Sequence, residues 1–318
     1  MQDASPWSRR GFLRQSASCA AHVGLMSALA PVWAKGLRAS QEQYPVVSRE
    51  PWGRIERIAE GIWALVSDPM QDRTTLCNGG IIAGRSGVVL IEAFGSEAGF
   101  EWMASEARRL AGRSPTHVVV THYHGDHTAG LGAVADLGAE VLATPVTRDL
   151  TRGNNQVPNP ILNLATPLDT IRPTEIDLGD RSLIIVPRRG HTDSDVTIEV
   201  TDPTVVFCGD LVWNEMFPNY VDATPSRLTQ AVTLMRASAA QTYVPGHGPL
   251  ADIVALDRYL DLLRHVESAA RDAIERGFTS EEAGEEYRLP PAMRDWTLFS
   301  DVYFARAIGA WMKELGRP

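Results

Sequence analysis

The sequence has few cysteines and no long hydrophobic run. Its 318 residues include three cysteines, Cys19, Cys77 and Cys208, and no CxxC pair. That is too few for a disulfide framework and gives no structural zinc knuckle. Cys77 and Cys208 are therefore most simply buried small side chains, with a disulfide between them as the alternative. Beyond the N-terminal region no segment reaches roughly 18 unbroken apolar residues, which argues against a transmembrane helix there.

The chain also lacks an excess of positive charge. Its formal net charge is −9 at pH 7, and an acidic surface repels phosphate backbones, so nucleic acid is a poor candidate partner. Hydrophobic residues make up 44% and charged residues 22%, an ordinary globular balance that argues against disorder. The length suffices for one large domain or two modest ones.

The first 34 residues have the order of features expected of an export signal. Arg9 and Arg10 precede a weakly apolar, alanine-rich stretch, and Val32-Trp33-Ala34 supplies small residues for a cleavage site. This region resembles a twin-arginine signal, which implies recognition by the twin-arginine export machinery and a periplasmic mature protein without stable membrane insertion. The alternative is a helix that happens to open with two arginines. The oligomeric state stays open.

The remainder begins with a polar segment and continues with short β-type runs. Residues 35–52 are interpreted as a linker, and residues 53–318 as one domain that includes the C-terminal helices. The runs that predict strands, punctuated by turn glycines, are Ile55–Ala59, Ile62–Val66, Gly80–Ala83 and Val88–Ala93. Strands that open a chain and then alternate with helices indicate a layered α/β architecture.

Helical patterns follow, and they dominate the C-terminal part. The segment Glu97–Leu110 predicts a helix and His117–Thr121 a strand. Residues 251–276 carry apolar positions at helical spacing and end at Gly277. Thr279 or Ser280, followed by glutamates, predicts the start of another short helix, and Asp301–Leu315 reads as a final amphipathic helix.

Three imidazoles and a carboxylate lie within six residues directly after the strand His117–Thr121. The segment reads His122-Tyr123-His124-Gly125-Asp126-His127. Neutral imidazole and carboxylate are the ligands that zinc prefers. In an extended stretch, residues two apart project to the same side, so His122 and His124 can bind one ion together. Asp126 and His127 fall where the chain turns into a helix and can face a neighbouring ion.

This segment resembles the signature of the metallo-β-lactamase superfamily, His-x-His-x-Asp-His after a strand. Three further motifs match the family in order: Gly190-His191-Thr192, Gly209-Asp210 and Pro245-Gly246-His247-Gly248. The resemblance covers roughly residues 53–265 and implies a four-layer αβ/βα sandwich, with two mixed sheets packed face to face and helices outside. The metals are then expected in the groove at one edge of the sandwich, where the strand ends converge.

The resemblance also implies a set of metal ligands. One Zn²⁺ ion would be held by His122, His124 and His191, and a second by Asp126, His127 and His247, with Asp210 bridging the two. Each ion then keeps an open position for water or substrate, which distinguishes a catalytic site from a closed structural one. Between two cations water ionises near neutral pH, and the resulting hydroxide attacks the substrate. Asp126 is the expected partner for orienting it.

Departures from the family pattern bear on the substrate. Classical β-lactamases of the superfamily place cysteine or serine where Asp210 stands, and a bridging aspartate resembles instead the glyoxalase-II-like hydrolases. The expected small-molecule substrate is therefore an ester, thioester, lactone or amide. The alternatives are β-lactam hydrolysis, or a mononuclear iron persulfide dioxygenase, for which iron is the metal. The family also commonly has aspartate where Glu92 stands, so the role of this longer side chain stays open.

Other residues carry weaker signals. The aromatic and apolar side chains Trp213, Met216, Phe217 and Tyr220 follow Asp210, and core packing and lining of a substrate pocket are equally favoured for them. For the C-terminal aromatics, core packing is the favoured interpretation; these are Trp296, Phe299, Tyr303 and Trp311. The loop Asp68–Thr75 resembles the position of a flap over the metals. The histidines outside the motifs, His22, His117 and His265, are interpreted as structural or as part of the signal.

Overall fold

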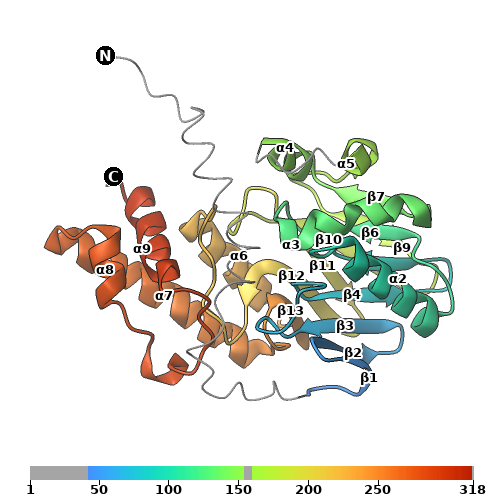
Figure 1. Ribbon diagram of the computed structural model, residues 1–318, viewed down its shortest axis with the longest axis horizontal. Helices are drawn as coiled ribbons and strands as arrows, with labels where there is room; N and C mark the ends of the chain where they lie inside the picture. Colours follow the sequence, from blue (N-terminus) through green and yellow to red (C-terminus); the bar gives the residue numbers. More distant parts are fainter. Residues whose placement is uncertain (1–41, 154–159, 317–318) are drawn as a thin grey trace, which may run out of the picture.

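The computed structural model describes residues 42–153 and 160–316, which form two mixed β-sheets with helices on their outer faces (Figure 1). The predicted export signal, residues 1–34, lies outside the described residues, as does Cys19. No helix in the described part is both long and apolar enough to cross a membrane.

The first sheet has eight strands whose spatial order is the same as their order in the chain. The first to the fifth strand pair with their neighbours in antiparallel fashion, and the fifth to the eighth pair in parallel fashion. They are β1 (Val46–Glu50), β2 (Gly53–Ala59), β3 (Ile62–Ser67), β4 (Gly79–Ala83), β5 (Val88–Ile91), β6 (His117–Val119), β7 (Glu140–Ala143) and β8 (Thr166–Pro167).

The second sheet has five strands in the order β13-β12-β11-β10-β9. Four consecutive strands form an antiparallel meander, and β13 adds in parallel to β12 after the crossover helix α6 (Pro225–Ala237). The strands are β9 (Thr174–Asp177), β10 (Ser182–Pro187), β11 (Val196–Thr201), β12 (Thr204–Trp213) and β13 (Thr242–His247). Nine of the ten residues of β12 are buried, because both faces of this strand are covered.

Three clusters of buried apolar side chains define the layers. One cluster lies between the two sheets and includes Val89 of β5 and Ile198 of β11. A second packs the first sheet against α2 (Glu97–Ala111) and the 3₁₀ helix η1 (Ala129–Leu137). The third packs the second sheet against α6 and the C-terminal helices. The order helix, sheet, sheet, helix confirms the predicted four-layer sandwich.

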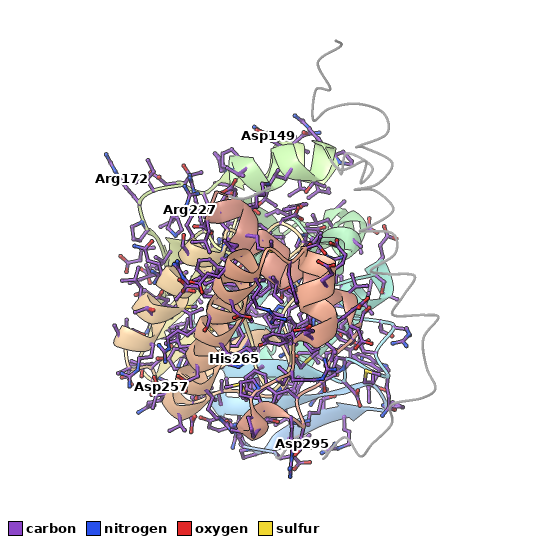
Figure 2. The ribbon with its side chains drawn as sticks, turned by 90° about the vertical axis from the view of Figure 1, so that its left-hand side faces the viewer. Asp149, Arg172, Arg227, Asp257, His265 and Asp295 are labelled. Atoms are coloured by element: carbon purple, nitrogen blue, oxygen red, sulfur yellow. The ribbon has the colours of Figure 1, made fainter. Side chains whose placement is uncertain are left out.

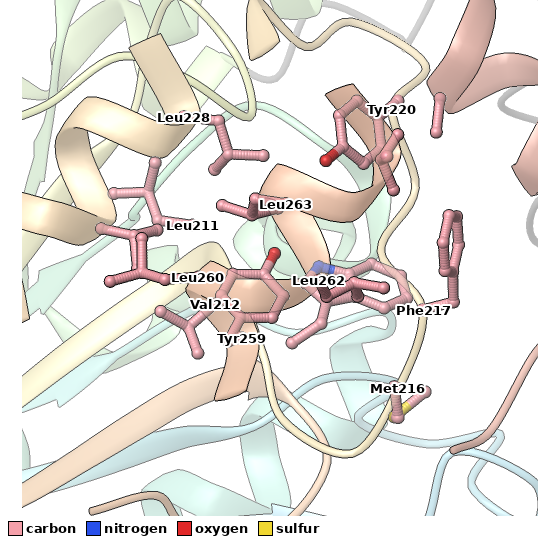
Figure 3. Close-up of a cluster of buried hydrophobic side chains, with 14 of the residues drawn as sticks. Leu211, Val212, Met216, Phe217, Tyr220, Leu228, Tyr259, Leu260, Leu262 and Leu263 are labelled. Carbon is pink, nitrogen blue, oxygen red and sulfur yellow. The ribbon is translucent and has the colours of Figure 1, made fainter. Parts of the chain in front are cut away.

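The third cluster joins the sandwich to the C-terminal helices α7 (Ile253–Arg276), α8 (Ser280–Glu286) and α9 (Val302–Glu314). Figure 3 shows Leu211 of β12 in one cluster with Leu263 of α7. Charged side chains such as Asp149, Arg172 and Asp295 instead lie on the periphery (Figure 2). The C-terminal helices therefore belong to the same core as the second sheet.

Local capping explains where the helices begin and end. Ser96 accepts a hydrogen bond from the backbone N–H of Gly99 at the start of α2, and Asp252 caps α7 in the same way. Thr279 and Glu282 form a reciprocal capping box at the start of α8, as the sequence indicated. The short helices are α3 (Gly125–Thr128), α4 (Pro145–Gly153), α5 (Pro160–Leu164) and η2 (Pro291–Met293).

The predicted linker is wrong for part of its length. Residues 35–52 were expected to connect the signal to the domain, but Val46–Glu50 form β1, which pairs with β2. This strand lies at the edge of the first sheet and alternates poorly between buried and exposed residues. Every residue of β1 is partly or fully exposed, so the strand buries no face that its sequence could show as a regular alternation.

Candidate metal centre

The segment after β6 changes from extended chain to helix, as predicted. The strand ends at Val119, and His124 keeps an extended backbone, with φ −63° and ψ 151°, as the residue before α3. Asp126 and His127 then lie in the first turns of that helix. The rings of His122 and His124 are 4.8 Å apart, so the two imidazoles that were expected to act together are neighbours.

Four buried side chains form a first group. The ligand atoms of His122, His124, His191 and Asp210 all lie within 4.8 Å of one another. Nε2 of His191 is 3.0 Å from Nδ1 of His124 and 3.3 Å from Oδ2 of Asp210. Two ring nitrogens this close require a proton or a cation between them, because two lone pairs would otherwise face each other.

A second group shares Asp210 with the first. It consists of Asp126, His127, Asp210 and His247, whose ligand atoms also lie within 4.8 Å of one another. Nε2 of His247 is 3.2 Å from Oδ2 of Asp126 and 3.3 Å from Oδ1 of Asp210. Nε2 of His127 is 3.1 Å from the same Oδ1. The two oxygens of Asp210 therefore face different groups, which is the arrangement expected of a bridging carboxylate.

The polar atoms that face the centre fit metal ions. Nε2 of His122, His127 and His247 and Oδ1 of Asp210 are buried, with no hydrogen-bond partner among the described residues. An unpaired buried polar atom is costly, and cations bound in the two groups would satisfy all four. All seven sequence-predicted metal ligands are thus brought together, and the donors are the imidazoles and carboxylates that zinc accepts.

Glycines allow the strand ends to approach one another. A Cβ atom at Gly246 would lie 2.0 Å from Oδ1 of Asp210, so only glycine fits beside the shared carboxylate. Gly209 has φ +52°, and a Cβ there would lie 2.7 Å from the hydroxyl of Thr121. The parallel register of β12 and β13 pairs Gly209 with Pro245 and Trp213 with His247, which places both motifs at one edge.

Glu92, the residue that departs from the family pattern, holds ligands of both groups. It follows β5 with φ 78° and is 1% exposed. Thr121 donates its backbone N–H and its hydroxyl to this carboxylate, at 3.2 and 2.5 Å. The same hydroxyl is 3.0 Å from Nδ1 of His122, and Oε1 of Glu92 is 3.0 Å from Nδ1 of His127. The longer side chain therefore approaches His127 directly and reaches His122 through the Thr121 hydroxyl.

Two supporting carboxylates were missed by sequence reasoning. Asp222 lies 3.0 Å from Nε2 of His124, which leaves Nδ1 of that ring for the centre, and it accepts a hydrogen bond from the Tyr123 hydroxyl. Asp195 accepts from the backbone N–H of His191 at 2.9 Å and from the Thr192 hydroxyl at 2.6 Å. Asp222 lies in a loop without a motif, whereas Asp195 lies three residues after the Gly190-His191-Thr192 motif, which was the one signal that could have pointed to it.

The two groups differ in the direction of their histidine pKa values. Burial lowers the pKa of His191 to about 3, and burial with repulsion from His127 lowers the pKa of His122 well below its usual value. Burial also acts against protonation of His247, but the carboxylates of Asp210 and Asp126 outweigh it and raise the pKa to about 9. The pKa of His127 is likewise raised, since nearby anionic groups outweigh its burial.

The remaining predicted residues fall outside the metal groups. Cys77 and Cys208 are free and buried, in different apolar clusters, so the alternative of a disulfide between them is not observed. His117 lies in β6, and His265 is an exposed residue of α7 that bonds the Tyr287 hydroxyl. These histidines are structural, as expected.

The aromatic and apolar residues after Asp210 belong to the core. All four, Trp213, Met216, Phe217 and Tyr220, are buried in the cluster between the second sheet and the C-terminal helices. Trp213 also packs against the ring of His247, with centroids 4.2 Å apart. Core packing, one of the two interpretations left open, therefore holds for these residues. In the loop Asp68–Thr75, the buried Asp72 accepts hydrogen bonds from three following backbone N–H groups and fixes the loop.

Comparison with known proteins agrees with this geometry. A family model described as the metallo-beta-lactamase superfamily matches residues 72–247. A metallo-beta-lactamase type 2 of Bacillus sp. (strain 170) is 22% identical over 237 residues, which are 72% of this chain and 90% of the relative. A hydroxyacylglutathione hydrolase of Shewanella sp. (strain ANA-3) is 28% identical over 149 residues, 45% of this chain and 50% of the relative.

Solved structures share the fold. The metallo-beta-lactamase from Pontibacter korlensis superposes with a TM-score of 0.56 and 23% identity, covering 67% of this chain and 99% of that one. A metallo beta-lactamase from Erythrobacter litoralis gives a TM-score of 0.58 and 22% identity, with 69% and 99% covered. The matched family region ends at His247, so α7, α8 and α9 lie beyond it.

Proposed function

Because this chain belongs to the metallo-beta-lactamase superfamily and is a hydrolase of that superfamily, we propose that it binds two zinc ions and hydrolyses an ester, thioester, lactone or amide. The observation that carries the proposal is the shared carboxylate. Oδ2 of Asp210 faces His191 and Oδ1 faces His127 and His247, so one residue serves two adjacent groups of ligand atoms. A closed structural site would need only one such group.

Each side chain has a distinct task in this proposal. His122, His124 and His191 hold one ion, Asp126, His127 and His247 hold the other, and Asp210 contacts both. Bound zinc ions supply a water whose pKa falls toward about 7 and polarise the bond to be cleaved. The pKa of the Asp126 carboxyl is lowered, since nearby His127 and His247 outweigh its burial. This carboxylate stays ionised at neutral pH and accepts a hydrogen bond that orients the attacking water.

The identity of residue 210 favours the wider hydrolase branch. An aspartate stands where classical β-lactamases place cysteine or serine, and one relative is named a hydroxyacylglutathione hydrolase. The second candidate function is β-lactam hydrolysis, which is supported by the names of other relatives. We further propose that the chain is exported by the twin-arginine route to the periplasm, on the basis of Arg9, Arg10 and the alanine-rich stretch that follows.

The test is a hydrolysis panel on the full chain loaded with zinc, with thioester, lactone, cephalosporin and phosphodiester reporters. We expect turnover of a thioester or a lactone that chelation abolishes and two equivalents of zinc per chain restore. Preferred turnover of the cephalosporin would instead establish the second candidate. One iron per chain with oxygen uptake would establish a persulfide dioxygenase, and no turnover of any reporter would contradict hydrolysis of these substrate classes.

Matched histidine variants keep the test specific. His124→Ala removes a ligand of the first group, and we expect loss of bound metal and of turnover. His265→Ala changes an exposed histidine of α7 that lies outside both groups, and we expect this variant to retain its bound metal and its turnover. Equal metal content in the two variants would contradict the assignment of His124 as a ligand.

A further inference from the structure

The loop that carries His247 is held by the carbonyl groups of its own backbone. Every backbone carbonyl of residues 245–250 accepts a hydrogen bond, and two asparagines, Asn78 and Asn214, supply a donor to each of them. Asn78 lies directly before β4 of the first sheet, and Asn214 lies directly after β12 of the second. The loop of this metal ligand is therefore bonded to both sheets of the sandwich.

Asn78 bonds the chain on both sides of His247. Its Nδ2 donates to the carbonyl of Pro245 at 2.9 Å and to that of Gly248 at 2.7 Å. Its backbone N–H donates to the carbonyl of Gly246 at 2.8 Å. These three bonds fix the backbone before and after the ligand, so they set the position from which the imidazole extends.

The amide of Asn78 has a single favourable orientation. Its Oδ1 accepts the backbone N–H of Ser67, the last residue of β3, at 2.8 Å, while Nδ2 donates twice to the loop. A flipped amide would turn its oxygen toward two carbonyl oxygens and its N–H groups toward another N–H. Asn78 is 2% exposed, so a lost bond would leave a buried polar group unpaired.

Asn214 holds the same loop from the other sheet. Its backbone N–H donates to the carbonyl of His247 at 3.0 Å, and its Nδ2 donates to those of Pro249 and Leu250 at 3.0 and 3.1 Å. The residue before it, Trp213, packs on the imidazole of His247 with ring centroids 4.2 Å apart. The end of β12 thus holds both the backbone and the ring of this ligand.

The space around His247 leaves little room for another position of the loop. A Cβ atom at Gly246 would lie 2.0 Å from Oδ1 of Asp210, and Nε2 of His247 lies 3.3 Å from the same oxygen. An imidazole nitrogen binds zinc at about 2.0–2.1 Å, so a small displacement of its backbone takes it out of ligand reach. Mutation of residues that hold a ligand in place typically costs about 10- to 100-fold in metal affinity.

We propose that Asn78 and Asn214 are positioning residues that act through the backbone of His247 and set the affinity of the second group for its ion. The inference rests on the proposed two-zinc site and extends it to residues outside both ligand groups. The three histidines of the first group lie in other segments of the chain. Loss of either asparagine should therefore weaken the second ion and spare the first.

The test isolates each ion with a histidine variant. His191→Ala leaves the second group complete, and His247→Ala leaves the first. With the full chain and zinc, competition with a chelator measures the affinity of the remaining ion in each background. We expect Asn78→Ala and Asn214→Ala each to reduce this affinity about 10- to 100-fold in His191→Ala. In His247→Ala the same changes should alter it by less than about twofold.

Tyr243→Phe is the matched control within β13. The Tyr243 hydroxyl also makes buried hydrogen bonds to the backbone: it accepts from the N–H of Ala240 at 3.0 Å and donates to the carbonyl of Met235 at 3.1 Å. We expect this variant to lower the melting temperature, as the asparagine variants do, but to leave the affinity for either ion within about twofold of its background.

Equal losses of affinity in the two histidine backgrounds, or a loss in Tyr243→Phe as large as in Asn78→Ala, would indicate a general effect on stability and overturn the proposal. Unchanged affinity in either asparagine variant would overturn the role of that residue. If Asn78→Ala does not fold, Asn214→Ala carries the same comparison. Zinc affinity is measured without a substrate, so a wild type that binds two ions but cleaves no reporter contradicts the proposed hydrolysis alone.

Discussion

The two metal groups are made from the same kinds of side chain, yet they hold protons differently. In the first group burial lowers the pKa of His191 to about 3, and in the second the carboxylates of Asp210 and Asp126 outweigh burial and raise the pKa of His247 to about 9. The difference follows from the number of nearby anions, because the first group contains one carboxylate and the second contains two. Two neighbouring ligand sets can thus differ in whether a histidine must lose a proton before a cation binds.

The largest expected effect on metal binding and turnover comes from removing Asp210, the residue that the two groups share. Asp210→Ala takes one oxygen from each group, so we expect metal content to fall at both and kcat/KM to fall about 1000-fold. Metal analysis and turnover of the best reporter measure this. Asp193→Asn, which changes an exposed carboxylate near His191 in sequence, is the control and should keep the metal content and the turnover of the wild type. Two full equivalents of metal in Asp210→Ala would show that the residue bridges nothing.

Removing one histidine at a time separates the groups. His191→Ala should empty the first group and His247→Ala the second, leaving about one equivalent of metal in each variant and reducing turnover about 100-fold. Elemental analysis of the two variants gives the stoichiometry. If either variant lost both metals or kept both, the division of ligands into two groups would be wrong.

Acidity should empty the second group before the first. A raised pKa means that His247 is protonated below about pH 9 before an ion binds, so a cation must displace that proton. The affinity of the second group for its ion should therefore fall at least about tenfold for each unit of pH below 9, since His127 in the same group also has a raised pKa. His191, with its pKa near 3, is already neutral in this range and imposes no such cost. Competition with a chelator between pH 6 and 9 measures both affinities, and identical pH slopes would contradict the comparison.

The ligands of this centre that lie close together in the sequence could be predicted from the residues alone, and the distant ones could not. His122, His124, Asp126 and His127 lie within six consecutive positions, so their spacing alone predicted a metal site. The four-layer fold and the ligands His191, Asp210 and His247 followed from the resemblance to a family, because their proximity arises only from the convergence of strand ends.

The residues that escaped prediction act through tertiary contacts without a motif. Asp222 is a single carboxylate in a loop, and nothing in its sequence neighbourhood distinguishes it from a surface residue, while only the nearby Gly190-His191-Thr192 motif hinted at Asp195. The edge strand β1 escaped for a different reason, since none of its residues is fully buried and its sequence shows little hydrophobic alternation.

The smallest expected effect tests how Glu92 connects the two groups. Glu92→Gln keeps the shape of the side chain but removes the negative charge that lies 3.0 Å from His127. We expect affinity for the second ion to fall about tenfold. The first ion should be affected less, because the Thr121 hydroxyl stands between Glu92 and His122.

Two further variants decide between charge and geometry. Thr121→Val removes the hydroxyl and should weaken only the first group, which chelator competition would detect. Glu92→Asp keeps the charge on a shorter side chain, and retained affinity there would mean that the extra methylene of this chain is unimportant. Loss in Glu92→Asp as large as in Glu92→Gln would instead show that the reach of glutamate, from a backbone with φ 78°, sets the position of His127. The carboxylate that departs from the family pattern would then hold the second group in place by its length as well as its charge.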